Sequence, residues 1–173
     1  MKFFLHPRTS RGQIFAICAI SLFALLGSSC HTAPLPKYVT EFYLEAPNQS
    51  GIAFTLPMSH LTYHRMSDPF LDLSKVVGVE QGRATVIQPG DTPGVFFYMN
   101  DDGRERLNIA TSANHQRHLF LFLNEKPMGA YFIDQPIDSG QLFMTLEVPD
   151  KELPAYVADL KESIKRLKDL KNK

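Results

Sequence analysis

Tryptophan is absent from this sequence of 173 residues, and cysteine occurs only twice. The aromatic residues are instead 13 phenylalanines and 6 tyrosines, which favour strands and therefore predict a sheet-rich core. An excess of charge of one sign is also lacking, because 18 basic residues balance 18 acidic residues. Three of the basic residues and none of the acids lie in the first 29 positions, so the remainder is weakly acidic. A weakly acidic body has no electrostatic footprint for nucleic acid.

The apolar run near the N-terminus, residues 14–26, is shorter than the roughly 20 residues that span a bilayer as a helix. A basic start precedes this run, and three small residues, Gly27, Ser28 and Ser29, follow it. This order is typical of a secretory signal peptide. We therefore expect residues 1–29 to be a signal peptide that is removed on export.

Cys30 directly follows these small residues, and the junction resembles the lipobox of bacterial lipoproteins. In that motif the cysteine receives lipid, including palmitate, and becomes the mature N-terminus. The motif usually has leucine three positions earlier, where this sequence has Gly27. The alternative is ordinary cleavage after Ser29, which would leave Cys30 as a free thiol. Because Cys18 would leave with the signal, no disulfide is expected, and an unpaired thiol in an exported protein favours lipidation of Cys30.

Two prolines make residues 30–37 a short, stiff linker between the expected lipid and the body of the chain. At about 3.3 Å per residue this linker reaches roughly 25 Å, so the body should lie close to the membrane. His31 stands where aspartate would signal retention in the inner membrane. The predicted location is therefore the bacterial cell envelope, lipid-anchored and facing the periplasm, at the outer membrane.

Residues 38–173 are predicted to form a single α+β domain, in which a turn at 88–94 separates an irregular β portion from a better-defined second half. The second half has a strand at 95–99 and a helix over 101–114, for which Asn100 is a good N-cap. A hairpin at 118–133, a strand at 141–148 and a final helix from about 150 follow. We expect an antiparallel sheet with two helices on one face, ferredoxin-like in its second half.

The final helix carries apolar residues every three or four positions, which gives it one buried face. Its end is rich in lysine, which suits the negative end of the helix dipole. The lysines are Lys161, Lys165, Lys168, Lys171 and Lys173. We interpret them as a solvated face of the helix.

The candidates for binding a metal or transferring protons are three pairs of side chains, with no motif around them. The pairs are His60 with His64, His115 with His118, and Asp134 with Asp138. No cysteine or close carboxylate frames the histidines, which favours surface histidines over a zinc site. The aspartates flank a proline turn and are expected to bond its backbone. With no nucleophile motif and no phosphate loop, we predict no enzyme, cofactor, metal or small-molecule substrate. A hydrolase is the least favoured alternative.

The hairpin at 118–133 allows two interpretations. Leucines at 119, 121 and 123 alternate with Phe120 and Phe122, so this strand is either buried on both faces or exposed on one. If Phe120, Phe122 or Tyr131 stays partly exposed, an extended peptide could add to a free edge of the sheet. Pro127 suits an edge strand, because proline cannot donate a hydrogen bond to a neighbouring strand.

Three phrases between residues 95 and 147 resemble the first periplasmic domain of SecD/SecDF preprotein translocase subunits. They are MNDDGRERL at 99–107, LFLFLNEKPMGAYFIDQPI at 119–137, and Gly140 opening a last strand. The family usually has Asp-Gly in the hairpin turn, where this sequence has Asn124 and Glu125, and nothing upstream of Gly94 matches. The resemblance implies a shared module that touches exported polypeptides or translocon subunits. It does not imply translocase activity, because that activity depends on membrane-spanning helices.

These observations predict a non-catalytic, membrane-anchored periplasmic lipoprotein that serves as a binding or accessory module linked to protein export. Its partners would be the membrane, through the lipid on Cys30, together with translocon subunits or exported polypeptides. The alternative is a structural envelope lipoprotein with no role in export.

Overall fold

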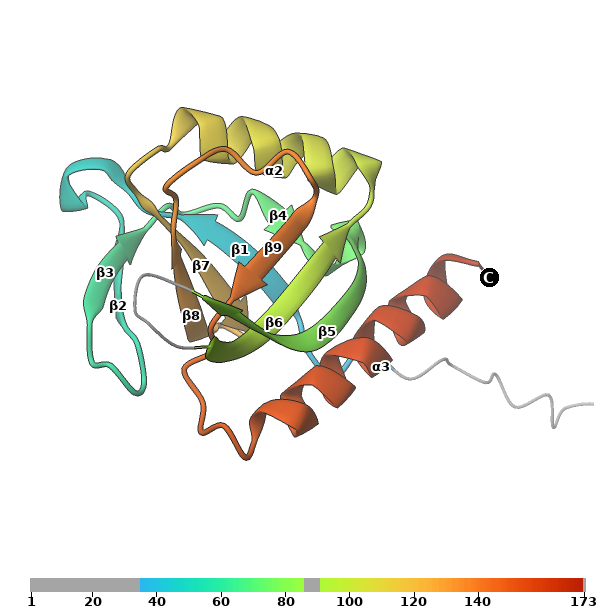
Figure 1. The fold of residues 1–173 in the computed structure, drawn as a ribbon. Helices are drawn as coiled ribbons and strands as arrows, with labels where there is room; N and C mark the ends of the chain where they lie inside the picture. The colour runs from blue at the N-terminus through green and yellow to red at the C-terminus, as the bar shows by residue number, and fades with distance from the viewer. Residues whose placement is uncertain (1–34, 86–90, 173) are drawn as a thin grey trace, which may run out of the picture. The chain divides into compact units, whose positions relative to one another are not determined.

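The computed structural model describes residues 35–85 and 91–172, so the predicted signal peptide and Cys30 lie outside the described residues. Most strands belong to one of two antiparallel sheets (Figure 1). The four-stranded sheet has the order β4 (Leu71–Asp72), β1 (Thr40–Leu44), β7 (His118–Leu123) and β8 (Lys126–Phe132). The three-stranded sheet has the order β5 (Val76–Thr85), β6 (Asp91–Met99) and β9 (Gln141–Met144). A separate hairpin pairs β2 (Ile52–Thr55) with β3 (Thr62–Arg65).

The predicted fold class is confirmed: the protein is α+β, with antiparallel sheets and two helices. The strands are more divided than the single sheet expected from the sequence. The four strands of the second half are shared between two sheets, because β6 and β9 pair with β5 while β7 and β8 pair with β1. The turn predicted at 88–94 lies partly outside the described residues, and residues 91–94 already belong to β6.

The two larger sheets share one core. The rings of Phe42 in β1 and Phe97 in β6 are both fully buried and meet edge to face, with 5.3 Å between their centroids. The amide of Glu147, just after β9, donates to the carbonyl oxygen of Met128 in β8 and joins the two sheets at one border. Packing from both sides explains why the sequence is rich in aromatic and aliphatic strand residues.

Helix α2 (Asp101–Ala113) packs against β4 and β6. Asn100 caps it as predicted, because its Oδ1 accepts a hydrogen bond of 2.8 Å from the amide of Gly103. Asp101 and Asp102 lie in its first turn, where carboxylates stabilise the positive end of the helix dipole. Asp102 also forms ion pairs with Lys75 and Arg106.

Helix α3 (Leu153–Lys171) packs against β5 with the apolar face predicted from its spacing. The buried residues on this face include Leu153, Val157, Leu160 and Ile164. The start of the described chain is fixed to this helix, because the amide of Tyr38 donates to Ser163 Oγ over 3.1 Å. No helix in the described part of the chain is long and apolar enough to cross a membrane.

Candidate peptide-binding surface

Strand β7 lies between β1 and β8, and its side chains alternate between two faces of the sheet. The leucines at 119, 121 and 123 enter the main core, whereas Phe120 and Phe122 lie in a second, smaller cluster with Tyr43. Phe120 is 0% exposed and Phe122 is 3% exposed. The expectation that either ring stays partly exposed is therefore corrected, and the strand is buried on both faces.

The β2–β3 hairpin covers these two rings. Phe54 from β2 packs edge to face on Phe120 and Phe122, with ring centroids 4.7 and 5.0 Å away. Tyr63 from β3 lies 5.1 Å from Phe120. Such aromatic contacts each contribute about 0.5–1.5 kcal/mol beyond the area that they bury. The hairpin is thus held on the sheet by an aromatic cluster separate from the main core.

Arg65 closes one side of this aromatic cluster. Its guanidinium lies 3.9 Å from the centroid of the Tyr43 ring and 5.0 Å from that of Phe122, which is cation–π geometry. The Tyr43 hydroxyl donates to Glu41 Oε2 over 2.9 Å. Burial raises the pKa of Tyr43, and the hydrogen bond to Glu41 raises it further. The tyrosine therefore stays neutral and packs as an aromatic ring.

The tip of the hairpin is tied down by a carboxylate. Glu147 Oε2 accepts hydrogen bonds from the amides of Met58 at 2.9 Å and Ser59 at 2.7 Å. A shallow hollow beside this contact is lined by Met58, Pro93 and Leu146 among others. The hairpin is thus attached at two places, by aromatic rings along its strands and by Glu147 at its tip.

Three apolar side chains of the hairpin face solvent: Ile52 is 49% exposed, Met58 is 55% exposed and Leu61 is 52% exposed. Sequence reasoning did not single out these residues. The sequence signal that could have found them is the concentration of apolar residues around the short turn at 56–61. The alternation of side chains along a strand does not say which face of the strand other residues bury. The β2–β3 hairpin lies at one side of the two larger sheets (Figure 1).

Tyr131 lies on β8, which is the last strand of its sheet. This is the edge position that peptide addition would need. The side chain is half-buried, and its hydroxyl donates to Asp134 Oδ1 over 3.3 Å. Burial raises the pKa of Tyr131, and the nearby Asp134 carboxylate adds to this effect. Phe132 beside it is 40% exposed. Among the described residues, no further strand pairs with this end of β8, so peptide addition there stays a prediction.

Two of the four histidines that were weighed as metal ligands, His115 and His118, have other partners. His118 Nδ1 lies 2.8 Å from Glu45 Oε2, and His115 Nε2 lies 2.7 Å from the carbonyl oxygen of Asp134. No group of three or more His, Cys, Asp or Glu side chains in residues 35–85 and 91–172 could hold a metal ion.

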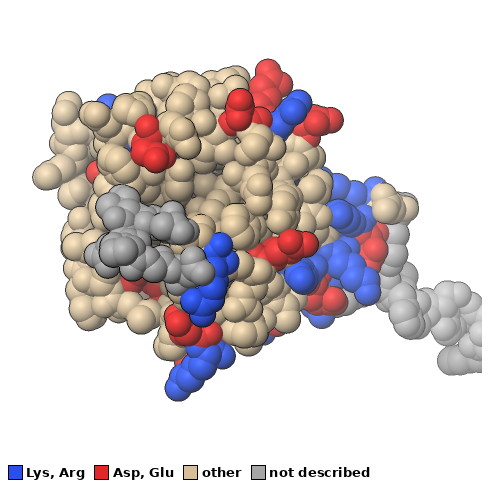
Figure 2. Space-filling model, viewed as in Figure 1, with Lys and Arg blue, Asp and Glu red and all other residues tan. Residues whose placement is uncertain are grey.

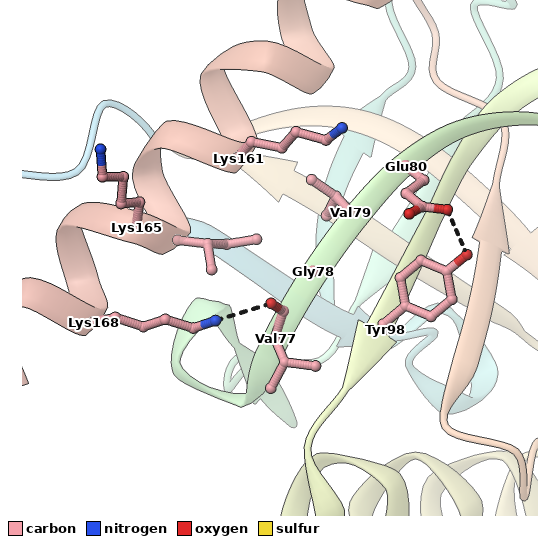
Figure 3. Close-up of a pocket in the computed structure, with 9 residues that line it drawn as sticks. Val77, Gly78, Val79, Glu80, Tyr98, Lys161, Lys165 and Lys168 are labelled. Atoms are coloured by element: carbon pink, nitrogen blue, oxygen red, sulfur yellow. Dashed lines mark hydrogen bonds between the residues drawn. The ribbon is translucent and has the colours of Figure 1, made fainter.

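A second hollow lies between β5 and α3 (Figure 3). Val77, Glu80 and Tyr98 lie on its sheet side, and the Tyr98 hydroxyl hydrogen-bonds to Glu80 Oε2 over 3.0 Å. The hydrogen bond to Glu80 is the main reason that the pKa of Tyr98 is raised. Three lysines of α3 line the other side: Lys161, Lys165 and Lys168.

The strand order, the two helices and the β2–β3 hairpin define an antiparallel α+β module. In fold, this module resembles the periplasmic domain of SecD/SecDF. One solved structure is of SecDF, described as a membrane component that enhances protein export. It is 15% identical with a TM-score of 0.53, over 94% of this chain and 71% of that chain. A crystal structure of SecDF in its super-membrane-facing form has 15% identity and a TM-score of 0.54, over 75% of this chain but only 19% of that chain.

The sequence matches no protein-family model, and no curated protein matches it. At 15% identity the likeness to SecDF is one of fold. The resemblance predicted from residues 95–147 is confirmed, and the structural match extends well beyond them, to residues upstream of Gly94 where the sequence offered no correspondence.

Proposed function

We propose that this chain is a non-catalytic binding module that faces the periplasm, is anchored by lipid on Cys30, and takes part in protein export. The observation that carries the proposal is the likeness of fold to SecDF over 94% of the chain. That protein is described as enhancing protein export. The lipid anchor rests on the sequence around Cys30.

The described surface supports a role in binding rather than catalysis. Exported chains cross the membrane unfolded and present extended, partly apolar segments. The hairpin offers exposed Ile52, Met58 and Leu61, and β8 offers a short stretch of sheet edge beside Tyr131. An extended segment can pair with such an edge through its backbone while its side chains contact neighbouring apolar groups.

The experiment that tests this proposal is photo-crosslinking in living cells. A photoreactive amino acid replaces Tyr131 in one strain and Leu61 in another, and the captured proteins are identified. We expect translocon subunits or exported polypeptides from both positions. The matched control places the same group at Ile109 on α2, which is 61% exposed and distant in sequence from the hairpin and from β8. Capture of the same proteins from Ile109, or none from Tyr131 and Leu61, would refute the proposal and favour a structural envelope lipoprotein.

A further inference from the structure

Lysines recur along one side of helix α3. Lys161, Lys165 and Lys168 are four and three residues apart, so they lie along one side of the helix and are exposed. We call these three residues the lysine stripe. Two acids of the helix have basic partners: Glu162 pairs with Arg166 at 2.9 Å, and Asp159 pairs with Lys37 at 2.5 Å. A third acid, Asp169, follows Lys165 by four positions and borders the stripe.

Two amines of the lysine stripe have no partner in the described part of the chain. Lys161 and Lys165 make no ion pair or hydrogen bond there, although Glu80 lines the same hollow. Glu80 accepts a hydrogen bond from Tyr98, and Lys168 donates to the carbonyl oxygen of Val77 over 3.1 Å (Figure 3). In the space-filling view, basic side chains gather where the second half of α3 lies (Figure 2).

The start of the described chain is fixed against the same helix. Arg166 Nη1 donates to the carbonyl oxygen of Leu35 over 3.0 Å, and Lys37 Nζ contacts Asp159. Cys30 precedes Leu35 by five positions, a length of chain that spans at most about 18 Å when fully extended. An acyl anchor on Cys30 would therefore hold α3 close to the membrane surface.

We infer that the lysine stripe binds the headgroups of anionic phospholipids in the membrane to which Cys30 attaches the chain. This inference rests on the proposed lipid anchor. A basic side chain within a Debye length of an anionic surface, about 8–10 Å, is attracted to it, and each strengthens binding about fivefold. Val77, which is 44% exposed beside the stripe, adds apolar contact at the interface. The stripe would turn the body of the protein so that α3 faces the bilayer.

The test is amine labelling of the full chain, reconstituted into vesicles of phosphatidylcholine alone or with phosphatidylglycerol. Labelling of each lysine is followed by mass spectrometry. We expect phosphatidylglycerol to slow labelling of Lys161 and Lys165 about fivefold, and high salt to remove this protection. Lys126 and Lys151 serve as internal controls, because both are exposed and lie off the stripe. Equal labelling in both vesicles, or equal protection of all four lysines, would overturn the inference.

Two double variants distinguish an effect of the lysine stripe from an effect of the net charge of the protein. Hydrogen exchange of the α3 backbone amides is the readout for these variants, and we expect phosphatidylglycerol to slow it in the unchanged protein. The double variant Lys161→Gln, Lys165→Gln should abolish this slowing. Lys126→Gln with Lys151→Gln removes the same charge and should leave that effect unchanged. Slower exchange of α3 that persists in the first variant would contradict a role for the stripe.

Flotation of the same samples distinguishes the anchor from the stripe. A chain that floats with both kinds of vesicle but shows no selective protection supports the anchor and refutes the stripe. Flotation with the anionic vesicles alone refutes the acyl anchor and supports the stripe. A chain that floats with neither refutes both. The export role is tested separately by crosslinking at Tyr131.

Discussion

Phe54→Ala should loosen the β2–β3 hairpin without unfolding the rest of the protein. Removing a fully buried phenylalanine side chain costs about 3–5 kcal/mol. Phe54 is only partly buried, so we expect about 2 kcal/mol. The loss falls on the hairpin, because Phe54 packs on the separate cluster of Phe120 and Phe122 and not on the main core.

Hydrogen exchange of the backbone amides measures this effect directly. A decrease of about 2 kcal/mol in the free energy of local opening accelerates exchange roughly 30-fold. We expect this acceleration in β2 and β3 and little change in β5, β6 and α3. Ile52→Ala is the matched control: Ile52 lies on the same strand but is half exposed, so its change should stay within about 0.5 kcal/mol.

Two results would refute this reasoning. Uniform acceleration throughout the protein would mean that the hairpin and the main core unfold as one unit. No acceleration in the hairpin would mean that Glu147 and the backbone contacts hold it without the aromatic rings. The predicted result would also expose Phe120 and Phe122, which an increase in the fluorescence of a dye that binds apolar surface would report.

Three further predictions concern single side chains. Glu147→Ala removes two charge-assisted hydrogen bonds from the hairpin tip, and we expect exchange of the Met58 amide to accelerate about tenfold, a change of about 1.4 kcal/mol; an unchanged rate would contradict this. The pKa of Asp102 lies below its ordinary value of 3.8, first because of Lys75 and then Arg106, so its stabilisation is present above that pH and is lost as the pH falls through the lowered pKa. Asp102→Asn should therefore lower Tm at pH 7, and this loss should shrink as the pH falls through the lowered pKa of Asp102; a loss in Tm that does not change with pH would refute an ionic origin. Cys30→Ser should release the chain from the membrane fraction and stop fatty-acid labelling; persistent labelling would contradict lipidation.

Local elements could be predicted from the sequence because their signals are local. The cap at Asn100 and the spacing of apolar residues along α3 each involve residues a few positions apart. The β7–β8 turn at Asn124 and Glu125 was also located, although it lacks the family's Asp-Gly. Both residues adopt positive φ, 50° for Asn124 and 66° for Glu125, as the two central residues of a type I′ hairpin turn require.

The pairing of strands that are distant in the chain could not be predicted, because it depends on contacts that produce no regular spacing of apolar residues in the sequence. The sequence indicated an irregular β portion before the turn at 88–94, but not that β1 would lie between β4 and β7. It also indicated that Phe120 and Phe122 share one face of β7, but not what covers that face. Phe54, which covers both rings, lies more than 60 residues earlier in the chain, so the buried state of both phenylalanines is a property of the fold.

The geometry of β8 limits how an exported segment could bind. The amide of Glu147 already donates to Met128 in the first half of β8, which leaves only the end near Tyr131 and Phe132 for a further strand. So short an edge offers few backbone hydrogen bonds, each with a net contribution of about 1 kcal/mol. Backbone pairing alone would therefore bind weakly. If exported chains bind here, side-chain contacts with Phe132 and with exposed residues such as Leu61 must supply much of the affinity. Leu61→Ser should then weaken crosslinking from Tyr131, and undiminished crosslinking would mean that the hairpin takes no part in binding.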